Sequence, residues 1–161
     1  MAAILAASGR VAIATSIKGR TAHLAWGTGS PAWSDPPPDP PASSTALLAE
    51  VGRRKATQVD YCVSDPAGAI SIPEGKFSVS ATPTNSLYFK FFFEFEEAVG
   101  STIREQAIIL DTVAAAGVPS GQFYLTPSQV ASSGPLLVIE RRSPIIRTAT
   151  VRQLFEFVVT F

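Results

Sequence analysis

The chain has 161 residues, and its 13 basic and 13 acidic side chains cancel to a formal net charge of zero at pH 7. This balance disfavours general nucleic-acid binding, which needs a strongly basic face. Only 16% of the residues are charged and 46% are hydrophobic, which favours a surface partly covered by other subunits. Cys62 is the only cysteine, so no internal disulfide can form, and no apolar run is long enough to span a membrane. We therefore expect a single domain over residues 1–161, made in the cytoplasm.

Two short strands are expected first, over Val11 to Ser16 and over Thr21 to Trp26. Lys18-Gly19-Arg20 lies between them and is typical of a turn. In the second strand, alternate positions are apolar and end in the large ring of Trp26.

A proline-rich stretch follows, in which six of the eleven residues from Pro31 to Pro41 are proline. Such a segment cannot enter a helix or donate to a sheet ladder, and it favours extended polyproline geometry. We expect an extended loop or arm over 30–43, which either lies on the protein's own surface or binds a partner. Trp33 favours partner binding, because tryptophan is enriched at interface hot spots.

A short helix is expected next, over about 45–55. Ser43-Ser44-Thr45 has the composition of an N-cap, and Leu47, Leu48 and Val51 form an apolar face at helical spacing. The basic run Arg53-Arg54-Lys55 suits the negative end of the helix dipole, where its side chains would be solvated.

The remaining sequence is dominated by strand signals, of which Ser86 to Ala98 is the strongest. A period of two places five large apolar side chains on one buried face. These are Leu87, Phe89, Phe91, Phe93 and Phe95. The segment from Val151 to Phe161 repeats the pattern, and turn signals separate about eight to ten strands in all. The fold class expected is mainly β, an antiparallel β-sandwich or barrel-like domain with one short helix and a Pro-rich arm.

No catalytic, cofactor-binding or metal-binding residue is predicted. The single histidine, His23, and the single cysteine cannot supply the ligands of a zinc site or the base and nucleophile of a triad. The acidic cluster Glu94, Glu96 and Glu97 could hold a hard cation, but solubilising charge on a strand is its ordinary role. We expect a protein that is not an enzyme and has no cofactor.

Several segments together resemble the small β-rich domains of phage baseplates and tail-fibre N-termini. They are Leu24-Ala25-Trp26-Gly27-Thr28-Gly29 with the proline-rich loop, Thr45 to Arg54, Gly100-Ser101-Thr102-Ile103-Arg104-Glu105, and a last strand ending in Val-Val-Thr-Phe. The chain departs from the family at Gln106-Ala107-Ile108-Ile109, where fibre domains usually continue Ile-Gly-Ile-Phe. Fibres also carry a long shaft after this domain, and the stop at Phe161 favours an adaptor or baseplate component.

The resemblance implies a structural virion protein of the tail, baseplate or tail-fibre attachment region. Its partners would be other tail or baseplate proteins and the tail fibre, with an oligomeric arrangement in the virion and neither nucleic acid nor membrane as a partner. The candidate interface residues are Trp33, Pro36, Pro37, Pro38, Pro40, Trp26 and Arg104.

Two alternatives remain open from the sequence. A carbohydrate-binding β-sandwich module would use Trp26, Trp33 and Tyr61 as stacking platforms for sugar rings. A hydrolase would use a pair of carboxylates.

Overall fold

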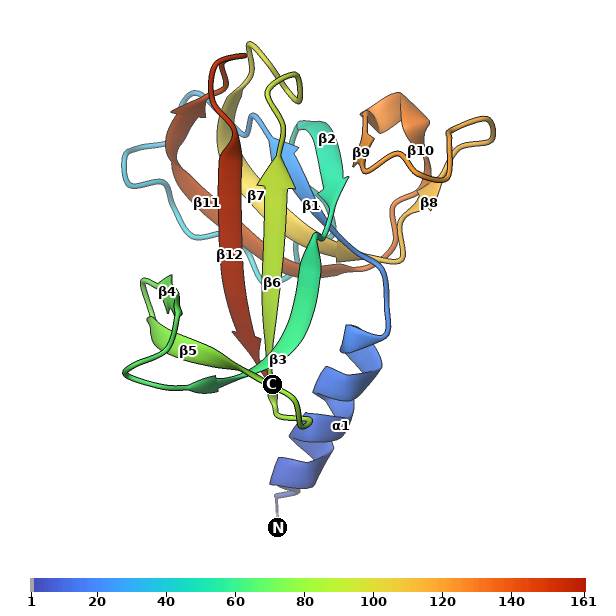
Figure 1. Cartoon of the computed structure of the whole chain (residues 1–161). Helices are drawn as coiled ribbons and strands as arrows, with labels where there is room; N and C mark the ends of the chain where they lie inside the picture. The colour runs from blue at the N-terminus through green and yellow to red at the C-terminus, as the bar shows by residue number, and fades with distance from the viewer. Residues whose placement is uncertain (1) are drawn as a thin grey trace. The chain divides into compact units, whose positions relative to one another are not determined.

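The computed structural model describes residues 2–161 and is mainly β, with 44% strand and 9% helix. Its sheets are antiparallel, one of them nearly closed and barrel-like, which confirms the expected fold class. The elements are α1 (Ala7–Lys18), β1 (Ala22–Gly27), β2 (Glu50–Lys55), β3 (Gln58–Ser64), β4 (Ile70–Ile72), β5 (Gly75–Ser80), β6 (Ser86–Phe93), β7 (Thr102–Leu110), β8 (Val113–Ala114), β9 (Tyr124–Leu125), a 3-10 turn η1 (Pro127–Gln129), β10 (Val130–Ser132), β11 (Leu136–Ile146) and β12 (Gln153–Thr160) (Figure 1).

The chain divides into two compact units, and each draws on separated stretches of sequence. The first contains residues 2–20, Ala56–Phe91 and Leu154–Phe161, and the second contains Thr21–Lys55 and Phe92–Gln153. Since neither unit is one continuous stretch, the expectation of a single domain stays a prediction.

The second unit is built on a five-stranded antiparallel sheet in the order β11-β7-β1-β2-β9. The expected strand over Thr21 to Trp26 is confirmed as β1, which pairs with β7 and β2 on its two edges and has every residue buried. Trp26 stacks on Phe93 with 3.6 Å between ring centroids, and the guanidinium of Arg147 lies 5.2 Å from the Trp26 ring. Arg147 is itself buried, and it donates hydrogen bonds to the carbonyl oxygens of Glu94 and Glu97.

The first unit contains the sheet β12-β6-β3-β5-β4 and the helix α1. Lys18 Nζ donates to the carbonyl oxygen of Val59 at 2.8 Å, and the Tyr61 hydroxyl donates to Thr15 Oγ1 at 3.0 Å, so the helix is tied to β3. On β6, Leu87, Phe89 and Phe91 are fully buried, as the period of two predicts. Figure 1 shows β6 between β12 and β3.

Two expected elements are wrong. The strand expected over Val11 to Ser16 is part of α1. Ala14 and Ile17, three residues apart, are buried together on one helical face, so packing outweighs the strand preference of the β-branched residues in this segment. The helix expected over 45–55 is a loop followed by β2. There the backbone N–H groups of Leu48 and Ala49 donate to Glu105 Oε1, and β2 pairs with β1, so sheet contacts outweigh helix propensity.

The aromatic strand is shorter than expected. β6 ends at Phe93, and Phe95 is 38% exposed instead of buried. The chain turns at this point because the backbone N–H of Glu94 donates to Glu97 Oε2 at 2.8 Å and the backbone N–H of Glu97 donates to the Glu94 carbonyl.

Candidate partner-binding surface

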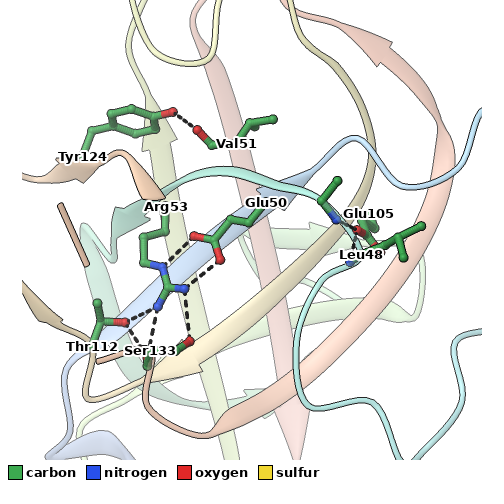
Figure 2. Close-up of polar contacts among 9 residues, drawn as sticks. Leu48, Glu50, Val51, Arg53, Glu105, Thr112, Tyr124 and Ser133 are labelled. Atoms are coloured by element: carbon green, nitrogen blue, oxygen red, sulfur yellow. Dashed lines mark hydrogen bonds and ion pairs between the residues drawn. The ribbon is translucent and has the colours of Figure 1, made fainter. Parts of the chain in front are cut away.

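The proline-rich segment forms a loop over residues 28–49, here called the strap. The loop closes at its base, where the backbone N–H of Thr28 donates to the carbonyl oxygen of Ala49 at 2.9 Å. Near that end, Glu105 Oε1 accepts hydrogen bonds from the backbone N–H groups of Leu48 and Ala49 at 2.6 and 3.2 Å; Figure 2 shows the contact with Leu48. Glu105 is only 2% exposed, so a buried carboxylate holds this end of the strap by hydrogen bonds.

Trp33 is the aromatic anchor of the strap. Its ring lies on Gly29, whose φ of +56° is in the left-handed region; a Cβ atom there would lie 2.2 Å from Trp33 Cζ3. On β11, the guanidinium of Arg141 lies 4.2 Å from the ring centroid, within the range of a cation–π contact. The ring is therefore held between two parts of the same unit and is half-buried.

Polar contacts join the middle of the strap to β11. Arg141 Nη1 donates to the carbonyl oxygens of Pro38 and Asp39 at 3.1 and 3.2 Å, and the Ser143 hydroxyl donates to Asp35 Oδ1 at 2.6 Å. The register of β11 against β7 is irregular between Arg141 and Ile145, at the place where the strap binds. The Pro-rich segment is thus bound to the protein's own surface in the isolated chain.

A small pocket of about 120 Å³ opens beside Trp33 and is lined by residues of the strap, β7 and β11. Its charged residues are Asp35, Arg104 and Arg142. Arg104 Nη1 donates to the Thr28 carbonyl at 3.2 Å, and burial lowers the pKa of the Arg142 guanidinium. Two arginines beside one aspartate make this surface locally positive in a chain without net charge.

The structure brings most of the predicted interface residues to this surface. Trp33, Pro37, Pro40 and Arg104 are half-buried, and Pro36 and Pro38 are exposed. Their role in binding a partner stays a prediction. The exception is Trp26, whose role as a contact residue is wrong because its ring is 0% exposed, stacked on Phe93 inside the unit.

The alternative functions are affected by the same geometry. Trp26 cannot stack on a sugar ring, and the hydroxyl of Tyr61 is bound to Thr15, with the Lys18 ammonium 5.4 Å from the Tyr61 ring. In the acidic cluster, the Glu97 carboxylate pairs with Arg54, and Glu94 pairs with Arg152 at 2.8 Å. Within residues 2–161, no three His, Cys, Asp or Glu side chains gather as a metal site would require.

Arg53 lies in a buried polar cluster that was not predicted from the sequence. The Arg53 side chain was expected to be solvated. Arg53 is 3% exposed and donates to both carboxylate oxygens of Glu50, at 2.8 and 2.7 Å. The same guanidinium donates to Thr112 Oγ1 at 2.7 Å and to the Ser133 carbonyl at 3.0 Å (Figure 2). Thr112 and Ser133 flank the segment that contains β8, β9 and β10, so Arg53 fixes both ends of that segment. The signal was hidden because the bonded groups lie 59 and 80 residues away in sequence.

The fold and this surface define the chain as a mainly β protein with a proline-rich strap fixed on one of its sheets. Over residues 2–161 it matches the model of the family described as "Baseplate wedge 3 tail fiber network component", and it belongs to that family. The chain is therefore a structural component of the phage baseplate and tail-fibre region, located in the virion tail, as the resemblance predicted. No curated protein matches the chain. No helix within residues 2–161 has the length and apolar character needed to cross a membrane.

Proposed function

We propose that the chain is a passive connector in the baseplate, which holds other baseplate or tail-fibre proteins through the strap and the neighbouring residues of β7 and β11. The role needs only protein contacts and no catalytic step. Association with further subunits in the virion also fits the low share of charged residues, 16%.

The observation that supports the proposal most directly is the fixed strap. Arg141 and Ser143 of β11 hold it by hydrogen bonds, while the side chains of Pro36 and Pro38 remain exposed. Because proline has little conformational freedom and the strap is already tied down, a partner that binds it meets a small entropy cost. Preorganised segments of this kind gain affinity by that saving.

The positive charge beside the strap indicates which chemical groups a partner would place there. Arg104 and Arg142 line a pocket next to the Trp33 ring, and arginine and tryptophan are the residue types that dominate interface hot spots. A partner that places an acidic or aromatic group against this pocket would complement both features.

The proposal is tested by measuring the mass of complexes in solution, first for the chain alone and then after mixing with purified tail and tail-fibre proteins. Arg104→Glu and Pro38→Glu should each weaken co-migration by about thirtyfold, equivalent to about 2 kcal/mol at a hot spot. Lys76→Glu is the matched control, since Lys76 is exposed and belongs to the other compact unit.

Retention of full affinity by both strap-side variants would refute the assignment of the surface. A chain that binds none of the tail proteins would refute the connector role itself. The thermal unfolding temperature of each variant must match that of the unmodified chain, so that lost binding is not lost folding.

A further inference from the structure

A second pocket, of about 240 Å³, lies in the unit that contains β1 and β2, apart from the strap residues. It is lined by His23 of β1, Lys55 of β2 and residues of the segment that contains β8 and β9, including Thr112 and Gln122. His23 and Lys55 are directly opposite in the antiparallel pairing of β1 with β2, so their side chains share one face of the sheet. The strands therefore present an imidazole and an ammonium side by side to this pocket.

His23 is an unexplained feature of the core. Its side chain is 5% exposed, and its Nδ1 atom meets no hydrogen-bond partner among residues 2–161. A buried polar atom without a partner costs free energy, and native proteins rarely retain one without a reason. Since His23 lines the pocket, a bound group could supply the missing partner.

The other lining groups differ in what they have left to offer. The Thr112 hydroxyl accepts from Arg53 and donates to the Ser133 carbonyl, and Gln122 Nε2 donates to the Tyr124 carbonyl and to Gln129 Oε1. Both are already engaged in holding the walls. Lys55 is exposed and forms no ion pair with any residue in the described part of the chain.

The electrostatics of the pocket favour an anion. The pKa of His23 is lowered to about 4 by burial first, and then by the positive charges of Arg53 and Lys55. The imidazole is thus neutral near pH 7 and can donate one hydrogen bond without adding charge. The guanidinium of Arg53 is held by Glu50 in a bidentate pair and does not line the pocket, so Lys55 is the charged side chain that lines it.

We propose that this pocket binds the carboxylate of an aspartate or glutamate side chain from a neighbouring polypeptide, with Lys55 Nζ as its ion-pair partner and the His23 imidazole as a hydrogen-bond donor. One ammonium matches the single negative charge of a carboxylate better than the double charge of a phosphate. The volume is below the roughly 300 Å³ at which pockets for drug-sized ligands begin, and it suits one side chain. The assignment of this carboxylate to a neighbouring polypeptide rests on the proposed connector function.

The single histidine makes the test direct, because the imidazole signals in an NMR spectrum of the labelled chain belong to His23 alone. The probes are two peptides that differ only in charge, acetyl-Gly-Glu-Gly-amide and acetyl-Gly-Gln-Gly-amide, and a third, acetyl-Gly-Gly-Gly with a free carboxyl end. We expect the Glu peptide to shift the His23 signals in a saturable manner and the Gln peptide to leave them unchanged.

Variants distinguish the pocket from general charge attraction. Lys55→Gln should weaken binding of the Glu peptide by about tenfold, the effect of removing a partly exposed ion-pair partner in a favourable site. Lys76→Gln removes an exposed lysine in the other compact unit and should leave the affinity unchanged. The thermal unfolding temperature of each variant checks that it is folded.

Three results would overturn the proposal. Equal shifts from the Glu and Gln peptides would exclude charge recognition, and no shift from either would exclude the site. A shift caused only by the peptide with a free carboxyl end would assign the pocket to a chain terminus instead of a side chain. All three measurements use the purified chain alone, so they can fail while the co-migration test of the connector role succeeds, or the reverse.

Discussion

The contact between Gly29 and Trp33 makes a quantitative prediction about the strap. In Gly29→Ala the new methyl group would lie 2.2 Å from Trp33 Cζ3, so the ring must move by at least about 1.2 Å to reach ordinary van der Waals contact, which begins at 3.4 Å. The φ of +56° adds about 1 kcal/mol of backbone cost for a residue with a Cβ atom. Displacement of the ring from Arg141, now at 4.2 Å, adds about 0.5–1 kcal/mol from the lost cation–π contact.

We therefore expect Gly29→Ala to lower the free energy of unfolding by about 2 kcal/mol. Gly117→Ala is the matched control. Gly117 has a φ of +88°, and a Cβ atom there would have no heavy atom of the described chain within 4 Å, so only the backbone cost of about 1 kcal/mol applies. The difference between the two variants isolates the ring contact.

Urea unfolding gives the two free energies, and limited digestion with chymotrypsin reports the strap itself. The bond after Trp33 should be cut faster in Gly29→Ala than in the unmodified chain, while Gly117→Ala should be cut at the unmodified rate. If both variants lose the same stability and are cut equally, the Trp33 ring does not hold the strap and the reasoning fails.

Three further predictions concern buried groups. Arg53→Met should destabilise the chain by about 3 kcal/mol in urea unfolding, because it leaves the Glu50 carboxylate without its partner; the double variant with Glu50→Gln should recover part of this loss. The pKa of His23 falls from 6.5 to about 4 on folding, so the unfolded chain binds more protons in this window and stability falls as the pH is lowered through it, by at most about 3 kcal/mol. His23→Gln should remove that pH dependence. The free energy of unfolding of both chains is measured at about pH 7 and about pH 5, and an equal change in the two chains would show that the assignment is wrong. Burial raises the pKa of the Cys62 thiol to about 11, so a thiol reagent should label the native chain far more slowly than the unfolded chain, and equal rates would contradict the burial.

The parts of the fold that were predicted correctly are those where local pattern and tertiary contacts agree. In β6, the alternate residues Leu87, Phe89 and Phe91 share one face and are all fully buried, and the strand pairs with a neighbour on each edge. The segment 45–55 shows the opposite case. Its helical spacing is real, but Glu105 binds two of its backbone N–H groups from 56 and 57 residues away, and no local pattern contains that contact.

The candidate site was predictable in part for the same reason. The composition of the segment around Trp33 indicated an extended loop that bears an aromatic anchor. Arg141 on β11 holds this loop by donating to carbonyl oxygens 102 and 103 residues away. The sequence therefore showed Arg141 and Arg142 only as a basic pair and did not indicate what they contact. Trp26 was predicted to be an interface residue because the sequence does not distinguish a tryptophan of the core from one on the surface. In the structure it lies in the core.

The closed base of the strap lets the length of its exposed middle vary at little cost to the sheet. Because the Thr28 N–H and the Ala49 carbonyl are joined, the residues between them form an insertion whose ends are fixed in place by β1 and β2. Doubling the length of such a loop costs only about 0.6 kcal/mol in closure entropy. Exchange of the exposed middle of the strap, with Gly29, Trp33 and the buried Leu47 kept, should therefore move partner preference between related chains while the underlying strands stay intact. A phage could then change the neighbours of this protein by altering one short segment.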